Sequence, residues 1–246
     1  MAAPRRPRLG PDEAHVWGLV LDVPAAVVAQ LAALLSAAER ARAERFHDAR
    51  LRERFVVAHG RLRQVLACYL ECPPAALDLE AADGSKPVVP GSGLEMSLSH
   101  AQGCGLVAVA RRAVGVDLEP LRPDLAVAEL APQVFSPREL AALASFAATE
   151  QVAAFLRGWT RKEAYLKARG VGFHFPPRDC EVALGPGVER ALLAVAGEPG
   201  EEERFRFRDL EPWPGFVGAL AVAAPLAGLG LFLFDEPRLE DDDTTP

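Results

Sequence analysis

Apolar positions along the chain follow two spacings, and each spacing predicts a different kind of element. Short apolar or alternating runs predict strands at residues 15–21, 105–110, 113–118 and 218–223. Longer stretches with apolar residues at helical spacing predict helices at residues 25–38, 49–70, 137–147 and 150–168. Strands and helices mixed in this way indicate an α+β fold. The chain lacks the glycine-rich dinucleotide motif of a Rossmann fold.

The predicted elements repeat loosely, each half running from a strand through two helical stretches to an apolar strand. RFHDARLRERF at 45–55 parallels VFSPRELAALASF at 134–146, and CGLVAVA at 104–110 parallels VGALAVA at 217–223. We therefore expect two similar α+β lobes, at residues 14–112 and 113–235. The ends, residues 1–13 and 236–246, are rich in Pro, Arg, Asp and Thr and are expected to be disordered.

Composition narrows the class of protein. With 246 residues and 50% hydrophobic content, the chain is long enough to form a substantial core. A net charge of −7 argues against a nucleic-acid-binding protein. No apolar run approaches the length of a membrane span, and the N-terminus has no signal region, so we expect a cytoplasmic protein. The four cysteines lack paired metal-ligand spacing, which favours reduced thiols.

The segment GVDLEP at 115–120 places two carboxylates on one strand. Side chains alternate along a strand, so Asp117 and Glu119 should share one face, with Val116 and Leu118 on the other. Pro120 should end the strand. Taken alone, an Asp-x-Glu pair is more often a solvated strand face than a functional site.

The segment WTRKEAYLK at 159–167 has helical spacing. Glu163 and Lys167 lie at i and i+4 on one face, with Trp159 one turn earlier. Such a pair alone usually reflects ordinary surface charge pairing. Together with Asp117 and Glu119, however, it gives three carboxylates on two elements, a set that suits a hard divalent cation. The chain has only three lysines, all within such motifs: Lys86, Lys162 and Lys167.

Two further motifs are MSLSH at 96–100 and GSKP at 84–87. Together with GVDLEP and WTRKEAYLK, they make the chain similar to one particular family of enzymes. It resembles the 4′-phosphopantetheinyl transferases, in particular the larger, two-lobed type similar to surfactin-synthetase activators. That family has a Gly-(Val/Ile)-Asp-x-Glu block and, about 40 residues later, Trp-x-x-Lys-Glu-(Ala/Ser)-x-x-Lys, and both are intact here. The resemblance covers residues 39–234. It implies two lobes related by a pseudo-twofold, with the active site in the cleft between them.

The resemblance also implies a reaction and its residues. A carrier-protein serine attacks the β-phosphate of coenzyme A, and adenosine 3′,5′-bisphosphate leaves. Asp117, Glu119 and Glu163 match the Mg²⁺ ligands, with Mn²⁺ as an alternative ion. Glu163 is the candidate base, acting directly or through a water, and Asp117 and Lys167 complete the catalytic set. The expected coenzyme A contacts are Arg42, Arg45, Arg63, Lys86, Ser99, His100, Lys162 and Lys167. The family has a glycine directly before the lysine that corresponds to Lys86, and this chain has Ser85 there.

The expected partners are coenzyme A and an apo acyl or peptidyl carrier protein, with no nucleic acid and no membrane. Two lobes in one chain would form an internal dimer, so we expect a monomer. The apolar segment GVGFHFPP at 170–177 is a candidate carrier contact or, equally, a packed turn. Two alternative functions stay open: a non-catalytic carrier- or CoA-binding module, and a Mg²⁺-dependent nucleotide hydrolase.

Overall fold

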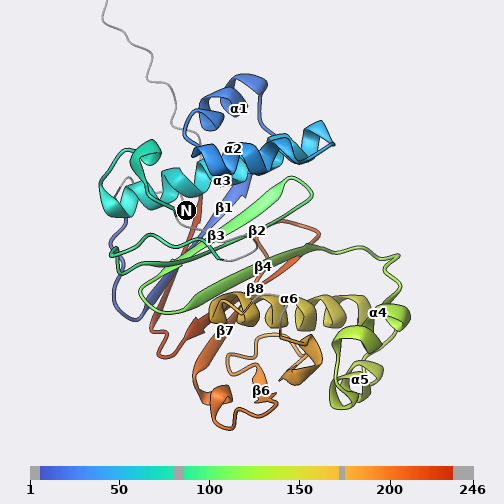
Figure 1. Cartoon of the computed structure of the whole chain (residues 1–246). Coiled ribbons are helices and arrows are strands. Elements are labelled where there is room, and N and C mark those ends of the chain that lie inside the picture. The colour runs from blue at the N-terminus through green and yellow to red at the C-terminus, as the bar shows by residue number, and fades with distance from the viewer. Residues whose placement is uncertain (1–5, 80–85, 172–174, 235–246) are drawn as a thin grey trace, which may run out of the picture.

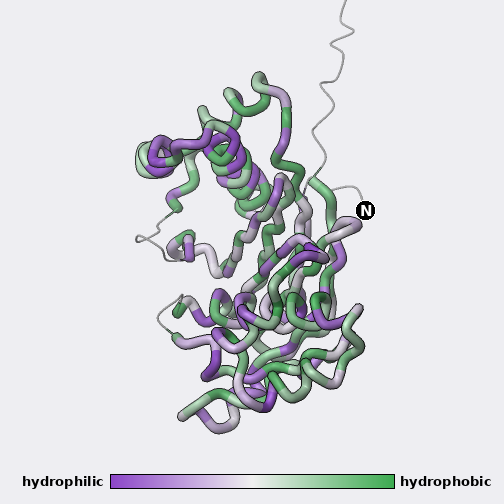
Figure 2. Tube along the Cα trace, turned by 90° about the vertical axis from the view of Figure 1, so that its right-hand side faces the viewer, coloured by the Kyte–Doolittle hydropathy of each residue, from purple (hydrophilic) through white to green (hydrophobic). Residues whose placement is uncertain are grey.

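The protein is built from four layers, a helical layer on each side of two packed sheets (Figure 1). The computed structural model describes residues 6–79, 86–171 and 175–234. Both helices and strands are present in each half, so the predicted α+β class is confirmed. The strands in the middle of the molecule carry long hydrophobic stretches, whereas the helical layer above them alternates between hydrophobic and hydrophilic residues (Figure 2).

The first sheet has the strand order β2-β3-β1-β9. Its members are β1 (Glu13–Val20), β2 (Glu95–Ala101), β3 (Cys104–Ala110) and β9 (Gly228–Leu233). Neighbours are antiparallel except β1 and β9, which run parallel. The helices α1 (Ala25–Ala32), α2 (Ala37–Glu44) and α3 (Ala49–Leu70) cover the outer face of this sheet (Figure 1).

The second sheet has the order β4-β8-β7, all antiparallel. Its strands are β4 (Val114–Pro120), β7 (Phe205–Leu210) and β8 (Phe216–Ala223). The long helix α6 (Gln151–Arg169) lies across its outer face, flanked by α4 (Val127–Val134) and α5 (Pro137–Ala144) (Figure 1). A small two-stranded sheet, β5 (Cys180–Val182) with β6 (Leu192–Val195), packs against this helical layer.

The core divides according to the layers. One apolar cluster lies between α3 and the first sheet and contains Trp17 and Phe55. A second lies between the two sheets and contains Val16, Val116 and Leu220. The third lies between the second sheet and α6. The central strands of both sheets are therefore buried on both faces, as their apolar runs require, whereas the edge strand β9 is partly exposed.

Gly115 sets the distance between β4 and α6. A Cβ atom at this position would lie 1.9 Å from the carbonyl oxygen of Ala164 and 2.5 Å from the backbone nitrogen of Ala168. Only a residue without a Cβ atom allows the helix backbone to approach the strand this closely. The glycine therefore brings the next residues of the strand within reach of side chains on α6.

Replacing Gly115 by alanine is expected to lower the free energy of unfolding by about 3 kcal/mol, at the upper end of the range for overpacking, because the clash is with backbone atoms. Urea unfolding measures this loss. Gly185→Ala is the matched control, since its Cβ would meet no heavy atom within 4 Å. Equal stability of the two variants would contradict the close approach of α6 to β4.

Several predicted boundaries differ from the structure. The helix predicted at 25–38 ends at Ala32. Ser36 then caps a second helix, α2, with a capping box to Glu39, and residues 39–44 of this helix had not been predicted. The predicted strands and helices elsewhere are present, with ends shifted by a few residues. Five elements had not been predicted: α4, β5, β6, β7 and β9.

The strand β9 comes from the second half of the chain but belongs to the first sheet. The division at residues 112 and 113 placed it in the second lobe, so the structure departs from that expectation at residues 228–233.

All four cysteines are free. Among the described residues, no helix is both long and apolar enough to cross a membrane.

Candidate active site

The strand β4 directs Asp117 and Glu119 toward α6, as the alternation of its side chains predicts. Val116 and Leu118 lie in the core between the sheets. On the opposite face, Asp117 contacts Lys167, and Glu119 accepts a hydrogen bond from the indole Nε1 of Trp159 at 3.3 Å. Both of these partners belong to α6. The prediction that the two carboxylates share a face is confirmed.

Lys167 holds the inner end of this group. Its Nζ lies 2.6 Å from Oδ1 of Asp117, 3.1 Å from Oγ of Ser99 and 3.3 Å from the carbonyl oxygen of Val116. Ser99, on β2, also donates to Oδ1 of Asp117 at 2.8 Å. Residues from β2, β4 and α6 thus meet where the two sheets adjoin.

The carboxylates carry more negative charge than Lys167 can neutralise. Asp117 and Glu163 are 5% and 7% exposed, and Oδ2 of Asp117 and Oε1 of Glu163 are buried without a hydrogen-bond partner among the described residues. Burial and the negative charges of Asp117 and Glu119 raise the pKa of Glu163 to about 7, against an opposing effect of Lys167. Burial and the charge of Asp117 also raise the pKa of Glu119.

These residues fit a divalent cation. A buried oxygen without a partner is energetically costly, and a hard cation would satisfy both such oxygens. In the described part of the chain, however, no group of three or more His, Cys, Asp or Glu side chains is placed so that it could hold a metal ion. The assignment of Asp117, Glu119 and Glu163 as metal ligands therefore stays a prediction, supported by the two orphaned oxygens.

His100 lies at the end of β2, next to Ser99, and its side chain reaches the surface. Packing of protein around the imidazole lowers its pKa to about 4, and the positive charges of His59, Lys167, Arg42 and Arg54 act in the same direction. A histidine among so many cationic groups marks a surface suited to anions.

The other predicted contacts on the first lobe are spread over this side of the molecule. Arg42 and Arg45 are exposed, on α2 and at its end, and the guanidinium of Arg42 lies 5.5 Å from the ring centroid of Phe55. Lys86 forms an ion pair of 2.7 Å with Glu95 on β2. Gly84 and Ser85 of the GSKP motif lie outside the described residues, as do residues 172–174 of the candidate carrier contact.

Arg63 does not lie where a coenzyme A contact would need it, and the prediction for this residue is corrected. It is 1% exposed and donates to Oε2 of Glu39 at 2.8 Å and to the carbonyl oxygens of Pro74 and Leu77. All three acceptors belong to the protein. Its guanidinium therefore ties α3 to α2 and to the turn that follows α3.

Lys162 is corrected in the same way. It is fully buried, and its Nζ donates to Oε2 of Glu139 at 2.7 Å and to the carbonyl oxygens of Pro177 and Cys180 at 2.7 and 2.6 Å. These three acceptors use all of the ammonium hydrogens. Lys162 is a structural residue of the second half, and only its neighbour Glu163 faces the site.

The sequence contains a signal for the buried positions of both Arg63 and Lys162. Glu39 and Glu139 are each the third helical residue of a Ser-x-x-Glu capping box, SAAE and SPRE. Each carboxylate then pairs with a buried cation 24 or 23 residues later on the long helix of its half. The same device in both halves agrees with the loose repeat in the sequence.

Three residues near the site were given no polar role by the sequence motifs. Trp159 had been expected to pack, but its indole also donates to Glu119. Arg54 forms a bidentate ion pair with Asp22, with nitrogen–oxygen distances of 2.7 Å. His59 stacks on Phe55. The helical spacing of residues 54–59 placed them on a helix, but nothing in a single sequence indicates which face of it meets the site.

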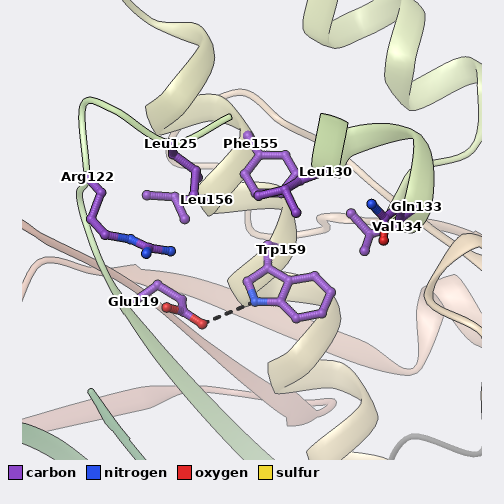
Figure 3. Close-up of a pocket in the computed structure, with 9 residues that line it drawn as sticks. All are labelled: Glu119, Arg122, Leu125, Leu130, Gln133, Val134, Phe155, Leu156 and Trp159. Atoms are coloured by element: carbon purple, nitrogen blue, oxygen red, sulfur yellow. Dashed lines mark hydrogen bonds between the residues drawn. The ribbon is translucent and has the colours of Figure 1, made fainter. Parts of the chain in front are cut away.

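A pocket adjoins the outer end of the site (Figure 3). Glu119 and Trp159 form one end of it, and Arg122 lies beside Glu119. Its volume is about 210 Å³, and most of its lining is apolar. The remaining lining residues come from α4, from α6 and from the loop before α4: Leu125, Leu130, Gln133, Val134, Phe155 and Leu156.

Known proteins resemble this chain over most of its length. The protein HetI of Nostoc sp. (strain PCC 7120), a 4′-phosphopantetheinyl transferase, is 39% identical over 217 residues, covering 86% of this chain and 88% of HetI. The transferase psf-1 of Bacillus pumilus is 33% identical over 60% of this chain and 63% of its own length. Sfp of Bacillus subtilis (strain 168) is 22% identical over 85% of this chain and 92% of its own length.

A family model describes the same relationship. The model of the 4′-phosphopantetheinyl transferase superfamily matches residues 113–211, a region that runs from β4 through α6 to β7 and so includes Asp117, Glu163 and Lys167. The site at the junction of β4 and α6 therefore lies within the part that the family shares. Because this model matches and HetI is 39% identical over 86% of the chain, the chain belongs to the 4′-phosphopantetheinyl transferase superfamily.

Proposed function

We propose that this transferase carries out its reaction where β2, β4 and α6 meet, with coenzyme A and an apo carrier protein as substrates. The serine Oγ of the carrier forms a bond to the β-phosphorus of coenzyme A. The bond from that phosphorus to the bridging oxygen breaks, and adenosine 3′,5′-bisphosphate leaves. Phosphoryl transfer of this kind needs positioned groups and charge neutralisation more than covalent chemistry by the protein.

Asp117, Glu119 and Glu163 are the proposed ligands of a magnesium ion, which Mn²⁺ could replace. When bound, the ion would neutralise charge on the pyrophosphate. The support for this proposal is the pair of buried, unpartnered oxygens on Asp117 and Glu163. Glu119 is more exposed and already accepts the indole hydrogen bond, so it is the ligand with the weakest structural support.

Glu163 is the proposed base. Without a cation, burial and neighbouring carboxylates raise its pKa to about 7, which is close to the value that suits proton transfer at neutral pH. A bound cation would oppose that shift and hold the carboxylate ionised. We therefore propose that the serine proton passes to Glu163 through an intervening water.

Lys167 and His100 are proposed to bind the phosphates. The Nζ of Lys167 is held at Asp117 and Ser99, so an ammonium group stands beside the carboxylates where a pyrophosphate would be neutralised. His100 reaches the surface from the next position on β2. Lys86, on the same lobe, would add a further positive charge.

The pocket in Figure 3 is proposed to receive the pantetheine arm. It opens beside Glu119, is lined mainly by apolar side chains and has room for part of a chain with few charges. An arm lying there would leave its phosphate end next to Glu119.

The acceptor is proposed to be an acyl or peptidyl carrier protein, and the enzyme to act as a cytoplasmic monomer. The segment at 170–177 is a proposed carrier contact, although its described part packs against the protein itself. The ring of Phe175 lies 5.5 Å from the guanidinium of Arg169, at the end of α6 that carries Lys167.

The observation that carries the proposal is the buried carboxylate pair with orphaned oxygens beside Lys167. Incubating the protein with coenzyme A, Mg²⁺ and a panel of apo carriers, followed by mass spectrometry, tests it. A carrier that gains the phosphopantetheine mass supports transfer. A protein that only binds carriers would add no mass, and a nucleotide hydrolase would consume coenzyme A when no carrier is present.

Lys86→Ala is expected to raise the KM for coenzyme A about tenfold and to leave kcat nearly unchanged, because a contact with the nucleotide end acts equally in ground and transition states. Steady-state kinetics measures both constants. Glu95→Gln is the control: it removes only the partner of Lys86 and should not raise KM. A loss confined to kcat in Lys86→Ala would contradict the assignment.

A further inference from the structure

Two serines of β2 face β4 across the junction of the two sheets (Figure 1). The strands β2 and β4 are each the end strand of a different sheet, and among the described strands no ladder joins them. Ser97 and Ser99 lie two positions apart on β2, so their side chains share one face of the strand. They are 2% and 8% exposed. Buried hydroxyl groups need hydrogen-bond partners, and β4 supplies one to each of them.

Ser97 satisfies the free edge of β4. In an antiparallel pair, alternate residues direct their backbone N–H and C=O groups away from the partner strand. Val116 is such a residue of β4: its backbone nitrogen donates to Oγ of Ser97 at 3.1 Å, and its carbonyl oxygen accepts from Nζ of Lys167 at 3.3 Å. The backbone directly before Asp117 is therefore held by one side chain from β2 and one from α6.

Ser99 holds the carboxylate that follows. Its hydroxyl donates to Oδ1 of Asp117 at 2.8 Å and accepts from Nζ of Lys167 at 3.1 Å. The same Oδ1 also accepts from Nζ of Lys167 at 2.6 Å. Oδ1 thus has two donors, whereas the buried Oδ2 has no partner among the described residues. Rotation of the carboxylate would exchange the two oxygens, and the two bonds at Oδ1 oppose that rotation.

We propose that Ser97 and Ser99 are positioning residues of the active site, which fix Asp117 so that Oδ2 is the oxygen presented to the divalent cation. This inference rests on the proposed function, since it takes Asp117 as a cation ligand. It also gives Ser99 a role other than the expected coenzyme A contact, because its hydroxyl proton is already used at Oδ1. Groups that hydrogen-bond to a metal ligand orient it, and their loss usually weakens metal binding about 10- to 100-fold.

The two serines lie in the first lobe, whereas the three proposed cation ligands lie in the second. The cation site would therefore depend on the contact between the lobes. Lys167 is proposed to bind the pyrophosphate, and its ammonium group would then be shared with that ligand. Ser99 would keep Oδ1 of Asp117 engaged when this happens, because its bond to the carboxylate does not involve the lysine.

The alternative role for both serines is structural: they would only join the two sheets. Loss of either hydroxyl would then lower stability and leave the affinity for a cation unchanged. Cation binding by the folded, full-length protein without coenzyme A separates the two roles. Mn²⁺ alone is the probe, because its free and bound forms differ in their electron paramagnetic resonance signal.

Ser99→Thr and Ser99→Val form one matched pair, since the two introduced side chains are similar in volume and only Ser99→Thr keeps a hydroxyl. We expect Ser99→Val to bind Mn²⁺ about tenfold more weakly than Ser99→Thr. Calorimetry with adenosine 3′,5′-bisphosphate in the presence of a chelator is the companion measurement. Its affinity should be equal in the two variants, whereas a coenzyme A contact through the hydroxyl would make it unequal.

Ser97→Ala has a matched control in Ser36→Ala. Oγ of Ser36 accepts from the backbone nitrogen of Glu39 at 3.2 Å, much as Oγ of Ser97 accepts from that of Val116. Each change leaves one backbone nitrogen without this acceptor, so both should lower the midpoint of urea unfolding. Only Ser97→Ala should also weaken Mn²⁺ binding, again about tenfold.

The Mn²⁺ affinities decide the question. Equal affinities within either pair overturn the proposal and leave the serines as contacts between the sheets. Weaker binding in Ser99→Val than in Ser99→Thr, together with weaker binding in Ser97→Ala than in Ser36→Ala, supports it. A wild type that binds no Mn²⁺ would refute the cation ligands, and this proposal with them. A wild type that binds Mn²⁺ but transfers no arm to any carrier would refute the proposed transfer alone.

Discussion

Asp117→Ala and Glu163→Ala are each expected to lower kcat at least about a hundredfold, as loss of a group that stabilises transition-state charge usually does. Both carboxylates lie inside the protein with one oxygen unpartnered, and a bound cation would give these oxygens a partner. Chelation of divalent ions should abolish transfer by the wild type. Carrier modification measured by mass spectrometry gives the rates, and Glu119→Gln should retain part of the activity.

A second measurement separates metal binding from catalysis. Mg²⁺ that binds only the folded protein should raise the thermal unfolding midpoint of the wild type and have little effect on Asp117→Ala or Glu163→Ala. Without metal, Glu163→Gln should be at least as stable as the wild type, because it removes a buried charge that has few partners. A midpoint that rises equally in all variants would rule out these residues as ligands.

Lys162→Ala is expected to lower the free energy of unfolding by about 3–5 kcal/mol, the usual effect of removing one partner of a buried ion pair. Glu139, which is 1% exposed, would be left charged and buried, and the carbonyl oxygens of Pro177 and Cys180 would lose their donor. Urea unfolding measures the loss. In the folded fraction, the KM for coenzyme A should be unchanged.

The paired variant Glu139→Gln with Lys162→Met is the control for this prediction. It removes both charges and keeps most of the volume, and such replacements usually cost much less than breaking the pair. The glutamine side chain introduced by Glu139→Gln would keep one oxygen, which can accept from the backbone nitrogen of either Ser136 or Val182, because these two donate to different oxygens of Glu139. If Lys162→Ala changed only the KM for coenzyme A, the original assignment of this lysine as a ligand contact would return.

Local periodicity explains what the sequence could predict. Alternation along β4 placed Asp117 and Glu119 on one face, and i,i+4 spacing placed Glu163 with Lys167. These relations depend only on the geometry of one element. The direction of Lys162 depends instead on what covers α6, and there the loop before β5 and the first residue of β5 supply two carbonyl oxygens. Motif position alone could not reveal that a cation next to a site residue faces the core.

The missed elements have similar causes. Pro132 lies inside α4 and argued against a helix there, yet tertiary packing against α6 outweighs it. The strand β9 contains two glycines, which weaken the strand signal. Gly230 is needed because a Cβ atom would lie 2.8 Å from the ring of His15. His59 escaped because histidine on a helix carries no signal of its partners until distant elements are in place.

The pairing of β9 with β1 has a consequence for synthesis of the chain on the ribosome. Glu13 pairs with Gly228, so one edge of the first sheet is completed only after β9, the last of the described strands, has been translated. Until then, the N-terminal half exposes an unpaired strand edge, which is a template for contact between chains. Such long-range pairing slows folding. The nascent protein therefore keeps an open edge on β1 until β9 has been made, and a premature stop before residue 228 would leave that edge open permanently.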